Sequence, residues 1–428
     1  MDTLVSFFSF SEPGVLSVTL GVMLLTASSA TVGTFTVLRQ RSLVGDAVAH
    51  AVLPGICLAF LVAKTKEPAV LIPGAALTGW LSLASIDGIT RFSKLKEDTA
   101  IAVVLSVFFG IGILLLTMIQ QGGFADQSGL DGFLFGRAAA LVGRDLVVFA
   151  VIAVVLVASV VLFFKEFQLL AFDPQMAEAA GLPVRSLRAL LTVLTVLAVV
   201  TGIQAVGVVL MAAMLITPAA AARYWTGNVA RMTALAAGLG ALSGLAGAYV
   251  SYAAPRMPTG PWIVLVISLI AMVSFILSPR RGVLARALKQ WRIRRHILDE
   301  NVLKELVHLG EADDRPTSPR TEAAIQTERS FPPADLRSTL RRLRRQGFVR
   351  RTAEGWSLTA EGLRKGRRVV KLHRLWELYL ERYMNIAPDH VHEDAETIEH
   401  VITPELEAEL VARLDHPDQD PHHRTIPY

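Results

Sequence analysis

The sequence predicts an all-α polytopic membrane protein with eight or nine transmembrane helices, followed by a smaller water-exposed part that contains helices and a short β-hairpin. Three observations support this prediction. The chain is apolar and rich in small residues up to about residue 279, and strongly charged beyond it. The first part contains a series of apolar segments long enough to span a bilayer. The second part shows amphipathic helical patterns and two short strands.

The composition limits the classes of protein to consider. The only cysteine, Cys57, lies in an apolar run, so a disulfide framework and a cysteine-rich zinc site are both excluded. The first residues do not resemble a cleaved signal peptide, because Asp2 and Glu12 accompany no Lys or Arg and the next apolar stretch is long enough to span. The net charge is +5, and the basic tail could meet anionic lipid or nucleic acid.

The membrane part divides into nine candidate spans, each with roughly the 20 apolar residues that a spanning helix needs. They are residues 15–38, 43–63, 69–90, 99–119, 145–165, 186–203, 205–222, 229–252 and 260–278. The sixth and seventh almost touch at residues 201–204, so the count is eight or nine. The high content of Gly and Ala favours close packing of helices in lipid, which suits a multi-helix bundle.

The charges in the loops predict the orientation, because cytoplasmic loops carry an excess of Lys and Arg. One set of loops contains Arg39, Arg41, Arg91, Lys94, Lys96, Lys165, Arg185, Arg188, Arg223, Arg231, Arg280 and Arg281. The other set contains only Lys64, Lys66, Arg137, Arg144 and Arg256. We expect the richer set to be cytoplasmic. Nine spans then place the N-terminus outside and the C-terminal tail in the cytoplasm.

Two ionisable residues stand out in the second span. Asp46 and His50 are four residues apart and therefore share one face of a helix. Such groups are costly in hydrocarbon unless they face a cavity, a partner or an ion. An imidazole with a carboxylate suits a transition metal, and a second copy across a dimer axis could complete the site. The alternative is a structural Asp–His hydrogen bond, with Asp46 at the cytoplasmic edge of the membrane.

Motifs for enzymatic chemistry are absent from the sequence. The chain contains no G-x-x-x-x-G-K-[ST] loop to hold nucleotide phosphates, so any ATP hydrolysis must come from a separate chain. It also contains no H-E-x-x-H pattern of a zinc protease. We therefore expect a protein that is not an enzyme.

The run 43–55, which carries Asp46 and His50, resembles the signature of the ABC-3 type metal permeases, which serve manganese, zinc and iron uptake. Residues 96–101, 173–181 and 204–219 also agree, and the resemblance covers about residues 10–280. It implies the permease subunit of an ATP-driven importer in the bacterial plasma (inner) membrane. The substrate would be a divalent ion of manganese, zinc or iron, with no organic cofactor.

The same resemblance implies partners and residue roles. The permease would form a homodimer or heterodimer, bind two cytoplasmic ABC ATPase subunits and receive metal from an extracellular or periplasmic metal-binding protein. Asp46 and His50 match the family's intramembrane polar pair, which implies a role on the translocation path. Residues 173–181 match the coupling helix that docks on the ATPase. The matching positions are Asp173, Ala177, Ala180 and Gly181, and an ordinary amphipathic connector is the alternative.

The tail shows a helix, a basic helix, a hairpin and a further helix, which is a winged-helix (α+β) pattern. The segments are residues 296–309, 333–346, strands at 348–351 and 356–358, and a helix capped by Thr359. Arginines crowd the second of these helices and could neutralise DNA phosphates: Arg337, Arg341, Arg344 and Arg345, with Arg342 between them. The alternative is a basic surface that rests on anionic lipid or on the ATPase.

Further along the tail, imidazole and carboxylate groups fall at helical spacing. His373 and Glu377 are four residues apart, and His392, Glu396, Glu399 and His400 share one helix face. These six side chains could form a site for manganese, iron or zinc. The alternative is a charged solvated surface with chance histidines.

Residues 296–428 resemble the winged-helix metalloregulators of the diphtheria-toxin-repressor and manganese-repressor family. The matching runs are 358–362, 373–377 and 394–400. The resemblance implies that His373, Glu377, His392, Glu396, Glu399 and His400 are metal ligands. The first tail helix departs from the family, because Lys304 is cationic and a poor ligand.

We therefore expect a transmembrane permease domain at 1–280, a basic linker at 281–295, a winged-helix domain at 296–370 and a helical metal-binding, dimerisation-like region at 371–428. The tail would sense cytoplasmic metal and slow import, or only dock. The alternative function is a membrane-tethered, metal-responsive transcriptional regulator. Transport is favoured, because an anchor needs only one span.

Overall fold

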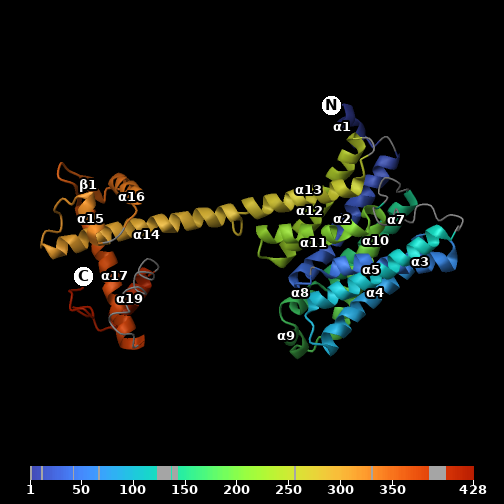
Figure 1. The fold of residues 1–428 in the computed structure, drawn as a ribbon, viewed down its shortest axis with the longest axis horizontal. Helices are drawn as coiled ribbons and strands as arrows, with labels where there is room; N and C mark the ends of the chain where they lie inside the picture. Colours follow the sequence, from blue (N-terminus) through green and yellow to red (C-terminus); the bar gives the residue numbers. More distant parts are fainter. Residues whose placement is uncertain are drawn as a thin grey trace. The chain divides into compact units, whose positions relative to one another are not determined.

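The computed structural model describes residues 2–10, 13–41, 43–65, 68–122, 136, 143–254, 257–328, 331–384 and 402–428. The chain forms two compact units, Met1–Arg286 and Ala287–Tyr428 (Figure 1). The regular elements in the described residues of the first unit are all helices. The second combines helices with one two-stranded sheet.

The described residues of the first unit begin with the short helix α1 (Asp2–Phe8) and form nine long helices. These are α2 (Pro13–Leu38), α3 (Val44–Ala63), α4 (Pro68–Phe92), α5 (Glu97–Gln121), α7 (Gly143–Leu162), α10 (Val184–Val206), α11 (Val208–Trp225), α12 (Val229–Ala253) and α13 (Thr259–Leu277). Within the described residues, eight of them, all but α11, are long and apolar enough to cross a membrane. The predicted membrane protein with eight or nine spans is confirmed.

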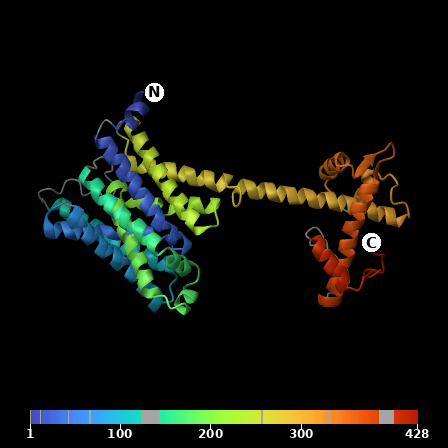
Figure 2. The same ribbon diagram turned by 180° about the vertical axis from the view of Figure 1, so that it is seen from behind.

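Helix α2 lies at the centre of this bundle and packs against α7, α10, α11 and α12 (Figure 2). Its buried hydroxyl groups donate to carbonyl oxygens one turn earlier on the same helix, as Thr31 does to Ala27 at 2.8 Å and Thr34 does to Ala30 at 3.0 Å. Such bonds satisfy polar groups that lipid cannot solvate. Small residues allow the close packing, since a Cβ on Gly33 would lie 1.8 Å from the carbonyl oxygen of Leu215.

The boundary between α10 and α11 differs from the prediction. We expected a break at residues 201–204, but α10 continues through them and ends at Val206. Gly202 lies inside the helix because of packing: a Cβ there would lie 2.2 Å from the Sδ atom of Met211. The break falls at Gly207, whose φ of 92° is accessible to glycine and strained for other residues.

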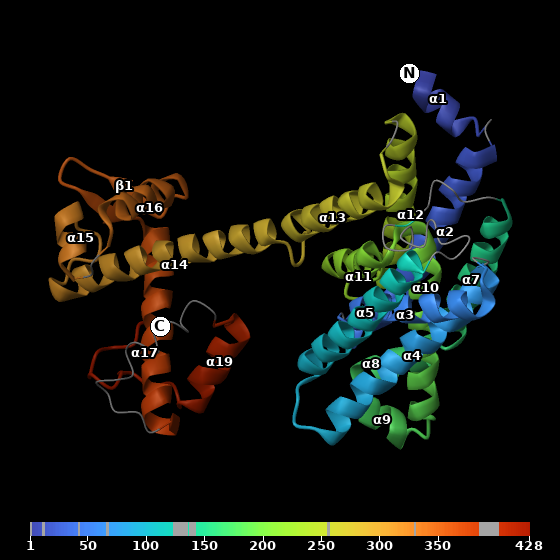
Figure 3. The same ribbon diagram turned by 45° about the vertical axis from the view of Figure 1, so that its right-hand side comes forward.

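Helices α3, α4 and α5 lie side by side (Figure 3). The crossing of α3 and α4 is close, because Gly55 and Gly74 face each other: a Cβ on Gly74 would lie 2.7 Å from the carbonyl oxygen of Gly55. On the other side of α3, a Cβ on Gly112 of α5 would lie 2.9 Å from the Cγ of Leu53. Because they lack a Cβ, these three glycines allow α4 and α5 to pack closely against α3, the helix that carries Asp46 and His50.

The second unit contains most of α14 (Val283–Ala312), then α15 (Glu322–Glu328), α16 (Pro333–Arg345), β1 (Val349–Arg351), β2 (Trp356–Leu358), α17 (Ala360–Met384) and α19 (Pro404–Arg413). The strands are antiparallel, with Val349 opposite Leu358 and Arg351 opposite Trp356. Apolar residues of α14, α15, α16, both strands and α17 form one core. The expected basic helix and hairpin are confirmed as α16, β1 and β2. Helix α15 was not predicted. The expected basic linker and the first tail helix form one continuous helix, α14.

A substitution tests the crossing of α3 and α4. We expect Gly74→Ala to lower the thermal unfolding midpoint of the purified protein in detergent, because the added methyl group would meet Gly55 and the Cβ of Ala59 at 2.8 Å. Overpacking of this kind costs about 1–3 kcal/mol. Gly88→Ala on the same helix is the control, since no atom lies within 4 Å of its added Cβ. Equal midpoints for the two variants would contradict this packing argument.

Candidate functional site

The intramembrane pair lies in the first half of α3. Asp46 is in the first turn of the helix, where a carboxylate interacts favourably with the helix dipole. The Nε2 atom of His50 lies 3.5 Å from Oδ1 of Asp46, and the side chains are 18% and 40% exposed, respectively. The imidazole packs edge-on against Phe109 of α5, with 4.8 Å between ring centroids. The two residues that spacing placed on one face are therefore neighbours.

One atom of this pair is left without a partner. The Nδ1 atom of His50 is buried and makes no hydrogen bond within the described part of the chain. A buried polar atom without a partner costs free energy. Among the described residues, no group of three or more His, Cys, Asp or Glu side chains could hold a metal ion. The pair therefore provides two metal-type donors, and other ligands must come from water or from elsewhere.

An ion-pair network that was not predicted joins the ends of the helices around α3. Arg41, in the connection from α2 to α3, lies 3.2 Å from Asp87 of α4 and 2.9 Å from Glu97 of α5. Burial, followed by the charges of Arg41 and Arg188, lowers the pKa of the neighbouring Arg39 to about 10. The sequence contained a weak signal for this network. If neighbouring spans are antiparallel, the start of α3, the end of α4 and the start of α5 lie on the same side of the membrane, and these ends carry opposite charges.

The expected coupling segment, residues 173–181, contains the short helix α9 (Pro174–Ala179), which directly follows another short helix, α8 (Phe164–Phe172). Asp173 caps α9 by accepting hydrogen bonds from the backbone nitrogens of Gln175 at 3.1 Å and Met176 at 2.9 Å. Ala177 is fully buried and anchors the helix.

The end of α9 is also well defined. Ala180 is its C-cap, and Gly181 follows with a φ of +79°. The backbone nitrogen of Leu182 then donates to the carbonyl of Ala177 at 3.1 Å, which closes a glycine-terminated helix end. Met176 stays 57% exposed, so α9 presents an apolar side chain outward.

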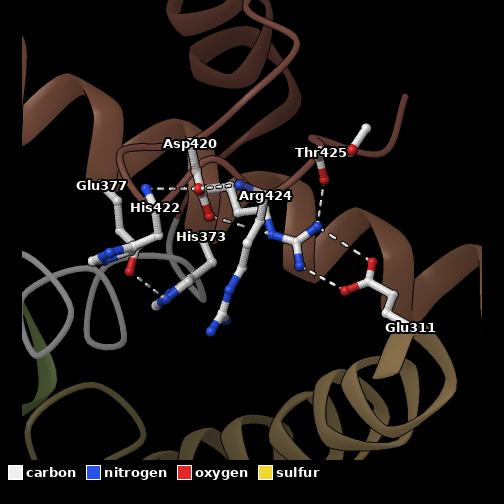
Figure 4. A network of polar contacts seen from close by, with 8 residues as sticks. Glu311, His373, Glu377, Asp420, His422, Arg424 and Thr425 are labelled. Atoms are coloured by element: carbon white, nitrogen blue, oxygen red, sulfur yellow. Dashed lines mark hydrogen bonds and ion pairs between the residues drawn. The ribbon is translucent and has the colours of Figure 1, made fainter. Parts of the chain in front are cut away.

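In the tail, the two described candidate ligands meet on α17. The Nε2 atom of His373 lies 3.0 Å from Oε1 of Glu377, and both side chains are almost completely buried. Figure 4 shows the two side chains directed toward each other. A buried imidazole with a carboxylate fits the donor preferences of manganese, iron and zinc. The other four candidates, His392, Glu396, Glu399 and His400, lie outside the described residues.

A second buried network surrounds Arg374, which follows His373 on α17 and which sequence reasoning missed. Its guanidinium contacts both carboxylate oxygens of Glu311, at 2.6 and 3.3 Å, and the carbonyl oxygen of Thr425 (Figure 4). Asp420 lies 3.6 Å from its Nε atom and accepts hydrogen bonds from the backbone of His422 and Arg424. This network ties the C-terminal loop to the helix that carries His373.

Next to this network lies a cavity of about 530 Å³, lined by residues that include His308, Glu311, Arg374 and Arg424. Burial, followed by the charges of Lys304 and Arg374, lowers the pKa of His308 to about 3. His308 is therefore neutral near pH 7. A neutral imidazole is compatible with metal binding nearby. The lining carries two arginines and two carboxylates, Glu311 and Asp314, so its formal charges balance.

The arginines of the basic helix α16 divide into two groups. Arg337, Arg341, Arg344 and Arg345 are exposed, as a role in contacting phosphates requires. The Nε atoms of Arg337 and Arg341 donate to carbonyls on their own helix, at 3.2 Å each. Arg342 is instead structural, because its Nε donates to both carboxylate oxygens of Asp299 on α14 at 2.9 Å.

The match with known families follows the division into two units. Residues 12–278 match the family described as ABC 3 transport family. Residues 359–428 match the iron dependent repressor, metal binding and dimerisation domain. The first match covers more than half of the chain and includes α2 to α13.

Individual relatives agree with both matches. The chain is 43% identical to the manganese transport system membrane protein MntC of Bacillus subtilis, over 89% of this chain and 87% of that protein. It is 45% identical to the zinc transport system membrane protein TroC of Treponema pallidum, over 67% of this chain and 95% of that protein.

A solved structure supports the fold of the first unit. PsaBC from Streptococcus pneumoniae in complex with Fab is 31% identical, with a TM-score of 0.59, over 67% of this chain and 99% of that chain. Its coverage corresponds to the size of the helical bundle and leaves the tail as an additional element. The chain belongs to the ABC 3 transport family and is a metal transporter permease that carries a repressor-like C-terminal domain.

Proposed function

We propose that this permease moves a divalent transition metal ion across the membrane, along a path on which Asp46 and His50 of α3 contact the ion. The observation that carries the proposal is the pair itself: a carboxylate and an imidazole lie 3.5 Å apart inside a spanning helix, and the Nδ1 of His50 has no partner among the residues that the structure describes. Manganese and zinc are the ions in the names of the relatives. Both accept imidazole and carboxylate ligands.

The pair can serve transport because it supplies only part of the coordination shell of a metal ion. Two donors cannot enclose a metal ion, so the ion keeps water or takes ligands from a second permease in a homodimer or heterodimer. A carboxylate offsets part of the ion's charge in the bilayer, where an isolated charge is costly. Transport also requires that the ion leave, and a partly coordinated ion is released more readily than a fully enclosed one.

The energy for transport comes, in this proposal, from separate ABC ATPase subunits, because the chain has no phosphate-binding loop. The segment around α9 is the proposed contact with the ATPase. Its helix is capped by Asp173, closed at Gly181 and held by buried Ala177, while Met176 is exposed to a partner. A binding protein on the opposite side would deliver the ion.

The proposed orientation follows from the basic residues of the loops. The loops rich in Lys and Arg, which we expect in the cytoplasm, include those with Arg39, Arg41, Lys165 and Arg188. The loops at both ends of α9 belong to this group. We therefore place α9 and the tail in the cytoplasm and the N-terminus outside.

For the tail, we propose a sensor of cytoplasmic metal that slows import. His373 and Glu377 would hold the metal, together with His392, Glu396, Glu399 and His400, and their carboxylates would offset part of its charge. The burial of His373 and Glu377 and the anchoring of Arg374 to the C-terminal loop make this part of α17 sensitive to added charge. Regulation requires that metal bind one conformation of the protein better than another.

The path residues can be tested in cells that lack other metal importers. We expect Asp46→Asn and His50→Gln to reduce the uptake of radioactive manganese or zinc by at least about tenfold, which corresponds to roughly 1.4 kcal/mol of lost ion stabilisation. Asp98→Asn is the control, since Asp98 is an exposed carboxylate at the start of α5. Normal uptake in both α3 variants, at normal membrane abundance, would exclude these residues from the path.

The coupling segment can be tested by removing its cap. We expect Asp173→Ala to weaken co-purification of the ATPase subunit and to lower metal-dependent ATP hydrolysis, because losing a helix N-cap costs about 1 kcal/mol. Glu178→Ala is the control: it removes an exposed carboxylate from the same helix without affecting the cap. If both variants assemble and hydrolyse ATP as the unchanged protein does, α9 is an ordinary connector.

The tail can be tested by measuring uptake as cytoplasmic metal accumulates. In His373→Ala with Glu377→Gln, we expect import to continue at the initial rate, whereas the unchanged protein slows. The exposed His416 provides a control variant, His416→Asn, that should still slow. A chain without residues 290–428 that retains the normal metal dependence would contradict a regulatory tail.

A further inference from the structure

A cluster of arginines at one end of the helical bundle has no role in the proposed transport path. Arg223, at the end of α11, and Arg280, Arg281 and Arg286, around the start of α14, line a cavity of about 490 Å³. Val37, Ala220 and Tyr224 form the rest of its lining. All of these residues belong to the first unit.

The wall of this cavity is fixed by hydrogen bonds between α11 and the end of α13. The hydroxyl of Ser278 donates to the carbonyl oxygen of Tyr224 at 2.5 Å, and the indole nitrogen of Trp225 donates to the hydroxyl of Ser274 at 2.9 Å. The turn into α14 is tight, since a Cβ on Gly282 would lie 2.4 Å from the carbonyl oxygen of Ser278. The backbone that carries Arg280 and Arg281 is therefore anchored beside Arg223.

The charge of the cluster is not balanced by the chain nearby. The sequence contains no Asp or Glu between Glu178 and Asp299. Among the described residues, no carboxylate forms an ion pair with any of the four lining arginines. Guanidinium groups remain charged at any physiological pH, so the four repel one another until an anion enters. Their planar donor groups match phosphate oxygens, often in a bidentate arrangement.

The surface beside the cluster is apolar. Leu277 is 54% exposed, and Trp225 and Phe275 are each 42% exposed. The ring of Phe275 packs edge-on against Tyr224, which itself lines the cavity. Aromatic residues next to arginines at the end of a span are typical of the membrane–water interface. An occupant with an anionic head and an apolar body fits both surfaces, whereas a free anion uses only the arginines.

We propose that this cavity, the arginine pocket, binds the phosphate headgroup of an anionic phospholipid, with the acyl chains along the exposed residues of α11 and α13. Basic pockets between membrane helices bind such headgroups in general. The lipid would neutralise the four arginines and stabilise the junction between α13 and α14. The leaflet follows from the proposed orientation and would be the cytoplasmic one, while the binding itself is independent of metal transport.

The test uses the full-length protein purified in a mild detergent, with bound lipids counted by native mass spectrometry. Phosphatidylglycerol is titrated against phosphatidylcholine of the same chain length. We expect retention of phosphatidylglycerol by the unchanged protein. In Arg280→Gln with Arg281→Gln we expect binding to weaken by about 25-fold, at roughly fivefold per lost arginine. Arg223→Gln, on a different helix, should weaken it by about fivefold.

The matched control is Lys289→Gln with Arg292→Gln, which removes the same charge from exposed positions of α14 outside the pocket. This control should retain the lipid. Equal loss in the control and pocket variants would show general attraction to the basic segment and overturn the proposal. Displacement of the lipid by millimolar inorganic phosphate would identify a simple anion site instead. If the pocket variants lost the ATPase subunit but kept phosphatidylglycerol, the pocket would be a protein-docking surface.

Discussion

A carboxylate and an imidazole on a spanning helix need a partner, because hydrocarbon solvates neither group, and this constraint organises the helices around α3. Asp46 and His50 lie 3.5 Å apart and partly satisfy each other, but a buried nitrogen of His50 makes no hydrogen bond to any part of the chain that the structure describes. Helices α4 and α5 approach α3 through Gly74 and Gly112. The ring of Phe109 covers the imidazole. The close packing limits the space around the pair, which favours a small ion over a bulky organic substrate.

Much of the fold was predictable because its signals are local in sequence. Long apolar runs defined the spans, and two short strands at 348–351 and 356–358, close together in the sequence, defined the hairpin. The errors arose where a local signal had two meanings. Two candidate spans almost touched at residues 201–204, but Gly202 there lies inside α10 and makes room for Met211, while Gly207 forms the break through its positive φ. Helix α15 was missed because seven residues after a proline-rich loop show too little periodicity.

The candidate sites were predictable only to the extent that helical spacing determines proximity. Asp46 with His50 and His373 with Glu377 are each four residues apart, so one turn of helix brings them together. Pairings between distant segments were not visible in the same way. Arg41 meets Asp87 from 46 residues away, and Arg374 meets Glu311 from 63 residues away. Arg342 belongs to the same basic run as the exposed arginines of α16, so the sequence does not distinguish it from them. Its contact with Asp299 of α14 shows that its role is structural.

The hydroxyl groups of α2 have a mechanical consequence. Ser28, Thr31 and Thr34 each donate to the carbonyl one turn earlier, an oxygen that also accepts the backbone bond of the helix. Sharing the acceptor weakens the backbone bond and lowers the resistance of the helix to bending. Because α2 packs against α7, α10, α11 and α12, the central member of the bundle is more compliant than an aliphatic helix of equal length. The surrounding helices can thus tilt about it while these three hydroxyl groups remain bonded.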